Sequence, residues 1–113
     1  MNKIEQAVIY NKILGSLACA GMGDALGAAT ELYSIDEIKA QWGGFLNAFV
    51  SPPADTFAGS LNGIAGLITD DSSQMYVFSE GLIEAGFDNF TNNDWLACLL
   101  RWADMQPYAN YKG

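Results

Sequence analysis

Four consecutive polar residues, Thr69-Asp70-Asp71-Ser72, stand directly before an amphipathic stretch and combine two carboxylates with two hydroxyls. Oxygen groups of this kind are the ligands that Mg²⁺ and Mn²⁺ prefer. The same residues also suit a helix N-terminus, where each acid contributes about 0.3–1 kcal/mol by opposing the helix dipole. The residues alone therefore leave two interpretations, a hard-cation site and a simple helix cap. A metal at a helix N-terminus would need further carboxylates to hold it.

A second unusual segment lies between Gly15 and Ala29, where most residues are small and Asp24 is the only charged one. Glycine costs about 1 kcal/mol per position in a helix interior, so such a run indicates that another backbone or a ligand comes close. A buried carboxylate is costly unless it is hydrogen-bonded. We therefore expect Asp24 to be a structural residue that accepts hydrogen bonds from neighbouring groups.

Hydrophobic periodicity and capping residues predict an all-α chain. We expect helices over residues 3–29 (continuous or with one break), 35–42 after Ser34, 71–85 and from about 92 onward, with Pro107 closing the last. Residues 45–68 are expected to form a long connection with little regular structure. The expected buried stripes are Ile4, Val8, Ile13, Leu14 and Leu17, then Met75, Phe78, Leu82 and Ile83, and finally Leu96, Leu99, Leu100 and Ala103.

Composition excludes several classes of function. The chain has 113 residues, one domain at most, with a net charge of −8 and only five scattered basic residues, so we expect neither nucleic-acid nor membrane-surface binding. It has no histidine, which excludes Ser-His-Asp and Cys-His catalysis and Cys/His metal sites within it. Cys19 and Cys98 lie in apolar stretches and are expected to be buried and reduced, which favours a cytoplasmic protein.

Two motifs in fixed order resemble those of the ADP-ribosylglycohydrolase family, which includes dinitrogenase reductase-activating glycohydrolases and J1-crystallins. The resemblance covers residues 12–113. The family's opening motif, approximately G-x-x-x-G-x-A-x-G-D-A-x-G, is matched within "KILGSLACAGMGDALGAATE", and its second, G-x-x-T-D-D-T/S, within "GLITDDSSQM". The matching residues are Gly15, Gly23, Asp24, Ala25 and Gly27, and then Gly66, Thr69, Asp70, Asp71 and Ser72.

The resemblance implies a helical bundle, a two-metal Mg²⁺ or Mn²⁺ centre, and ADP-ribose or an ADP-ribosylated protein as the ligand. Carried over by position, Thr69, Asp70 and Asp71 are metal ligands, and Glu31 or Asp71 activates the water nucleophile. We expect the remaining roles to be substrate binding by Gly63, Gly66 and Ser72 and a structural, outer-layer role for Asp24. The glycine-rich segment ending at Gly66 either approaches the phosphates or is only a flexible lid.

The family completes its metal centre with a D-x-D-T/S motif that does not occur in these residues. We therefore expect residues 1–113 to be an incomplete, N-terminal part of the domain, with little or no activity alone. One alternative is a non-catalytic helical interaction module that associates with itself or with a C-terminal half. Its contact surface would include Trp42, Trp95, Trp102, Tyr108 and Tyr111. The other is an unrelated acidic helical protein in which Thr69-Asp70-Asp71-Ser72 is only a cap.

Overall fold

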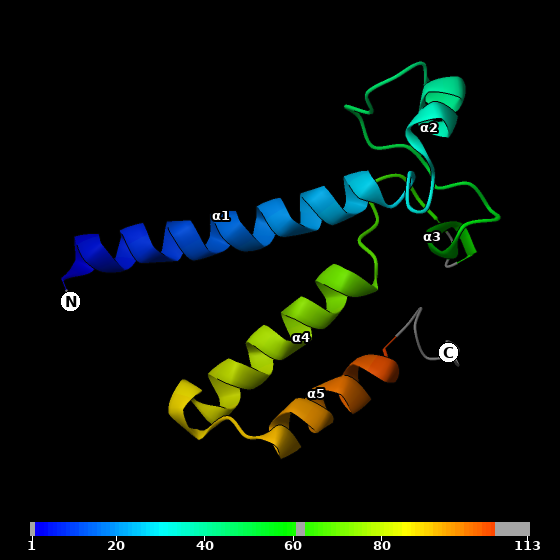
Figure 1. Ribbon diagram of the computed structural model, residues 1–113. Helices are drawn as coiled ribbons and strands as arrows, with labels where there is room; N and C mark the ends of the chain where they lie inside the picture. Colours follow the sequence, from blue (N-terminus) through cyan, green and yellow to red (C-terminus); the bar gives the residue numbers. More distant parts are fainter. Residues whose placement is uncertain (1, 61–62, 106–113) are drawn as a thin grey trace.

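The computed structural model describes residues 2–60 and 63–105, and all regular structure within them is helical (Figure 1). The prediction of an all-α chain is therefore confirmed. No helix in these ranges is both long and apolar enough to cross a membrane. The elements are α1 (Lys3–Gly27), α2 (Ile35–Trp42), α3 (Phe57–Ser60), α4 (Asp70–Ala85), a 3₁₀ turn η1 (Phe87–Asn89) and α5 (Asn92–Ala103).

Helix α1 is one unbroken helix of 25 residues. Asn2 caps it, because its side-chain oxygen accepts hydrogen bonds from the amides of Ile4 and Glu5 at 3.0 and 2.9 Å. Only its C-terminal end is covered, where Gly21 and Ala25 are buried. The rest of the helix projects beyond α4 (Figure 1).

The stripe expected on α1 is therefore not buried. Ile4, Val8, Ile13 and Leu14 are exposed, and only Leu17 is half-buried. Leu17 is also where α4 reaches the helix, since the hydroxyl of Tyr76 donates to the Leu17 carbonyl at 3.0 Å. Apolar periodicity marks the surfaces that a helix can bury, but the neighbouring helix decides which of them it does bury.

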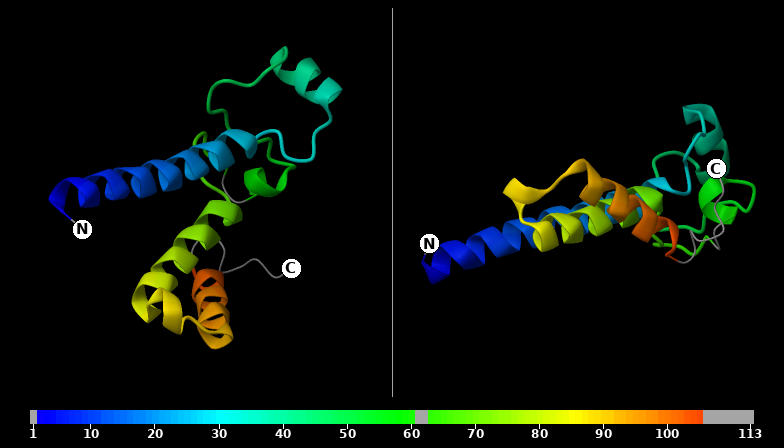
Figure 2. Two further views of the ribbon diagram at one scale, coloured as in Figure 1. Left: turned by 60° about the vertical axis from the view of Figure 1, so that its left-hand side comes forward. Right: turned by 90° about the horizontal axis from the view of Figure 1, so that it is seen from below.

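Helices α4 and α5 form an antiparallel hairpin whose members lie side by side in all views (Figures 1 and 2). The buried line on α4 consists of Ser73, Val77 and Gly81, which are four residues apart and so share one face. Opposite them lies Cys98, the buried residue of α5. A Cβ added to Gly81 would collide with the Cys98 sulfur, so the absent side chain sets how closely the helices approach.

Polar groups and aromatic rings also join the hairpin. The indole nitrogen of Trp102 donates to the Ser73 hydroxyl at 2.8 Å. The Phe78 and Trp95 rings stack with centroids 3.8 Å apart. The leucine stripe predicted for α5 is wrong, because Leu96 and Leu100 are exposed, as is Ala103, and only Leu99 is half-buried. On α4, Ile83 is likewise exposed, while Met75, Phe78 and Leu82 are half-buried.

The expected bounds of α2 are confirmed by its caps. Ser34 and Glu37 form a reciprocal capping box, and Gly43 ends the helix in the left-handed region with φ of 78°. The connection after α2 contains a helical turn, α3, that was not predicted from the sequence. The Thr56 hydroxyl helps to form it by accepting from the Gly59 amide at 3.1 Å.

The two thiols are both free, but they do not form the buried pair that we expected. Cys98 is buried in the α4–α5 hairpin, whereas Cys19 is exposed on the uncovered part of α1. Pro107, the expected end of the last helix, lies outside the described residues, and α5 ends at Ala103.

We predict that Gly81→Ala destabilises the protein by about 1–3 kcal/mol, because the new methyl overpacks the buried Cys98 sulfur. Gly15→Ala is the matched control, since a Cβ there meets nothing within 4 Å and alanine is the better helix former. Urea unfolding followed by circular dichroism measures both free energies. Adding Cys98→Ala to Gly81→Ala should restore part of the loss. If Gly81→Ala proves as harmless as Gly15→Ala, the close approach of α4 and α5 is wrong.

Candidate metal centre

The carboxylate of Asp24 connects the C-terminal end of α1 to the start of α4. One of its oxygens, Oδ2, accepts from the backbone amides of Thr69 at 2.8 Å and Ser72 at 3.2 Å. The other, Oδ1, accepts from the Thr69 hydroxyl at 2.6 Å. Asp24 therefore satisfies amides at the α4 N-terminus that would otherwise lack a partner, although it lies 45 residues before Thr69.

The charge of Asp24 is stabilised by these contacts. Burial raises the pKa of this carboxyl, but the hydrogen bonds from Thr69 and Ser72 outweigh it, so the pKa lies below its ordinary value. Asp24 is thus ionised at neutral pH. Because Asp24 already accepts from the amides of Thr69 and Ser72, these two amides are not free to bind a phosphate, which is the usual ligand of a helix N-terminus.

A small acidic cavity opens beside this contact, with a volume of about 270 Å³. Thr69 forms part of its wall as the buried N-cap of α4, whereas Asp71 lies exposed in the first turn of that helix. Glu31, in the turn that follows α1, is exposed as well. The lining consists of Asp24, Gly27, Ala28, Thr30, Glu31, Thr69 and Asp71.

Asp70 is half-buried and does not line this cavity. Burial raises the pKa of its carboxyl, and the neighbouring charges of Asp71 and Asp24 raise it further. Three carboxylates thus lie around one helix N-terminus, and one of them is held in an environment that disfavours its charge. A cation nearby would relieve this repulsion.

The donor atoms at this cavity are oxygens, which are the ligands that a hard divalent cation prefers, although the protein offers few of them. Within residues 2–60 and 63–105, no three His, Cys, Asp or Glu side chains form a group that could hold a metal ion. Mg²⁺, however, commonly binds through one or two carboxylates and keeps several waters. The Thr69 hydroxyl and the Asp71 carboxylate therefore suit such an ion and leave positions for further ligands.

The structure brings together some of the predicted site residues and separates others. Asp24, Glu31, Thr69 and Asp71 share the acidic cavity, with Asp70 in the same helical turn. Ser72 is buried, and its amide points to Asp24. Gly63 and Gly66, the two glycines predicted to bind substrate, do not line the cavity. Gly63 donates to the Gly59 carbonyl at 3.3 Å, and Gly66 lies beside the Phe49 ring with φ of 83°.

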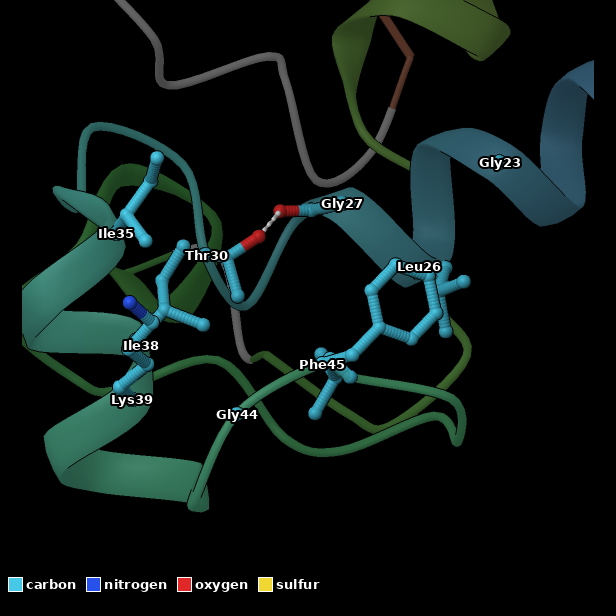
Figure 3. A pocket seen from close by; sticks show the side chains of 10 residues that line it. Gly23, Leu26, Gly27, Thr30, Ile35, Ile38, Lys39, Gly44 and Phe45 are labelled. Carbon is cyan, nitrogen blue, oxygen red and sulfur yellow. Dashed lines mark hydrogen bonds between the residues drawn. The ribbon is translucent and has the colours of Figure 1, made fainter.

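A second cavity, of about 530 Å³, adjoins the acidic one and was not foreseen from the sequence. Residues of α1, of α2 and of the loop after α2 contribute side chains to it, among them Leu26, Ile38 and Phe45 (Figure 3). Gly27 and Thr30 line both cavities. The Thr30 hydroxyl donates to the Gly27 carbonyl at 3.1 Å (Figure 3). No sequence motif predicted that Thr30 would line a cavity.

Together, these features define an all-helical protein in which an acidic cavity lies between the end of α1 and the start of α4. The family model for ADP-ribosylglycohydrolase matches residues 5–113 of the chain. The chain therefore belongs to the ADP-ribosylglycohydrolase family, which confirms the resemblance seen in the two motifs. Comparison with curated proteins and with solved structures gave no significant match. Members of the family are hydrolases that act on ADP-ribosylated substrates and are generally metal-dependent.

We predict that the contribution of Asp24 to stability depends on pH. Because its folded-state pKa lies below the unfolded value, its stabilisation is complete above that value and disappears as the pH falls through the folded pKa. Asp24→Asn lacks this titration. The wild type should be more stable than Asp24→Asn by about 1 kcal/mol near neutral pH, and this difference should shrink below about pH 4.

Urea unfolding at a series of pH values measures the difference between the two proteins. Asp88→Asn is the control for removing one negative charge, since Asp88 is an exposed acid at η1. A difference for Asp24→Asn that stays constant into the acid range would show that the ionised carboxylate is not the acceptor at the α4 N-terminus.

Proposed function

We propose that this chain forms part of a metal-dependent glycohydrolase that removes ADP-ribose from a modified protein side chain or from a small ADP-ribosyl compound. The supporting observation is the acidic cavity, where oxygen groups of Thr69, Asp71 and Glu31 lie around one space next to the ionised Asp24. Family membership supplies the substrate class.

We propose Thr69, Asp70 and Asp71 as the residues that hold Mg²⁺ or Mn²⁺. The substrate carries a pyrophosphate, and a chain with net charge −8 repels it. A divalent cation held by these residues would offset this repulsion and would help to deprotonate the attacking water. Burial raises the pKa of the Asp70 carboxyl most, and the cation would offset the smaller effect of the charges of Asp71 and Asp24.

The protein itself supplies the base. A water attacks the anomeric carbon of the ribose, and a carboxylate accepts the proton of the water. The bond to the side-chain nitrogen or oxygen breaks, and the leaving atom takes up a proton from the resulting carboxylic acid or from solvent. Glu31 suits this role because it lies in the turn after α1, at the cavity and exposed to solvent. Asp71 is the alternative base, on the opposite element of the same cavity.

We propose that Gly63 and Gly66 contact the substrate through their backbone amides. Gly66 is exposed and adopts a positive φ of 83°, and we propose that its amide donates to a phosphate oxygen. Gly63 packs closely on Gly59 and has less space. Ser72 contributes through the Asp24 contact that orders the start of α4.

The small number of protein ligands leads to a second part of the proposal. Since the described residues contain no group of three His, Cys, Asp or Glu side chains that could hold a metal ion, we propose that a further polypeptide segment, in this chain or another, completes the centre. This chain alone should then turn over ADP-ribosylated substrate very slowly. Robust metal-dependent release of ADP-ribose by the purified chain would contradict this part of the proposal.

A non-catalytic interaction module is the second candidate function, and the apolar surface favours it. Leu32 and Phe45 are more than nine-tenths exposed, and the uncovered part of α1 adds Ile4 and Val8. Trp95 is half exposed, but Trp102 donates to Ser73 within the hairpin. Tyr108 and Tyr111 lie outside the described residues.

A Mn²⁺ titration followed by electron paramagnetic resonance tests the proposed function. We predict saturable binding by the wild type, tighter binding with ADP-ribose present, and loss of binding in Asp70→Asn/Asp71→Asn. The control is Asp36→Asn/Asp88→Asn, which removes the same charge from exposed positions in α2 and η1 and should bind as the wild type does. If both double variants bind equally, Asp70 and Asp71 act only as first-turn acids of α4.

A further inference from the structure

We propose that Asp24 is a positioning residue that fixes the polarity of the Thr69 hydroxyl. It holds the hydroxyl hydrogen on the α1 side, so that an oxygen lone pair of Thr69 is directed to the acidic cavity. This inference rests on the proposed function, since it concerns how Thr69 is prepared to bind the cation.

The distances decide where the hydroxyl hydrogen lies. Thr69 Oγ1 is 2.6 Å from Asp24 Oδ1 but 3.5 Å from Asp71 Oδ2. A hydroxyl has one hydrogen and two lone pairs, and an ionised carboxylate can only accept. The short contact to Asp24 is that of a charge-assisted hydrogen bond, so the hydrogen is donated there and not to Asp71.

The lone pairs of Thr69 are then left on the other side of the oxygen. One of them faces the Asp71 amide, which donates over a long 3.4 Å. Thr69 is only 6% exposed, and it lines the acidic cavity. The second lone pair is therefore available at the cavity wall, where a cation would bind.

Asp24 also fixes the backbone from which this hydroxyl extends. Its second oxygen holds the amides of Thr69 and Ser72, so the first turn of α4 is anchored to α1 on both sides of the acidic pair. Without Asp24, the nearest remaining acceptor for the hydroxyl would be Asp71 Oδ2. The hydrogen would then occupy a carboxylate oxygen that the proposed function assigns to the metal.

Asp24→Asn separates the polarity of this bond from the anchoring of the helix. Its side-chain oxygen can still accept from the two amides, which leaves its NH₂ group to face Thr69 Oγ1. An NH₂ group donates, so the Thr69 lone pair is used and the hydroxyl hydrogen turns toward the cavity. We expect Mn²⁺ affinity to fall by about 10-fold to 100-fold, the usual effect of removing a residue that orients a metal ligand.

A double-mutant cycle tests whether this loss passes through Thr69. Thr69→Val removes the hydroxyl and nearly preserves the side-chain shape. If Asp24 acts by orienting that hydroxyl, Asp24→Asn should lower Mn²⁺ affinity in the wild-type background but change it little in Thr69→Val. Equal losses in both backgrounds would overturn the proposal, because Asp24 would then act through its own charge. Asp36→Asn is the charge control, and it should leave the affinity unchanged.

Paramagnetic broadening of backbone NMR signals near Thr69 measures these affinities, even when binding is weak. A wild-type chain whose signals are unaffected by Mn²⁺ would overturn the proposed function, and this inference with it. A wild-type chain that binds Mn²⁺ but gives additive effects in the cycle would overturn this inference alone.

A second measurement does not need any variant to fold. In the metal-free wild type, the Thr69 hydroxyl proton should show a nuclear Overhauser effect to the β protons of Asp24. An effect to the β protons of Asp71 in its place would overturn the proposed polarity.

Discussion

The interaction on which the rest of the structure depends is the contact of the Asp24 carboxylate with the N-terminus of α4. Three hydrogen bonds reach this carboxylate, two from backbone amides and one from a hydroxyl. They make it favourable to remove a charge from water inside a helical interface. The contact holds α1 and α4 together at the point where the acidic cavity opens. Small residues around it, such as Gly21 and Ala25, let the two helices come close enough for the bonds to form.

Local sequence signals predicted the helices well, because the capping residues that start and end a helix lie next to it in the sequence. Ser34 and Thr91 form capping boxes at the starts of α2 and α5, and Gly43 and Gly86 follow the ends of α2 and α4. The short helix α3 was missed because residues 57–60 fall within a glycine- and proline-rich connection. The prediction of which residues are buried on α1 and α5 was wrong for a different reason. On α5, close packing depends on Cys98 fitting against Gly81, and no periodicity in either helix encodes that pairing.

The same distinction applies to the candidate site. Asp70 and Asp71 could be recognised because they are adjacent in one motif. The position of Asp24 in a stretch of small residues indicated that it would be buried and would need hydrogen-bond partners. Its actual partners lie 45 and 48 residues away, so their identity follows only from the packing of α1 on α4. Thr30 carries no local signal at all. It lines the acidic and the apolar cavity because the turn after α1 passes between them.

The acidic pair, Asp70 and Asp71, lies at the N-terminus of α4, where the Asp24 carboxylate is already bound. The partial positive charge of the α4 N-terminus favours one carboxylate, and Asp24 already accepts from two of its amides, those of Thr69 and Ser72. Asp70 and Asp71 therefore gain less from the dipole than acids at an ordinary cap, and they also repel Asp24 and each other. The raised pKa of Asp70 reflects its burial first and this repulsion second. A simple cap would not need the second and third carboxylate. The proposed cation would make the arrangement favourable, because it would balance the negative charge of the carboxylates that the helix dipole does not compensate.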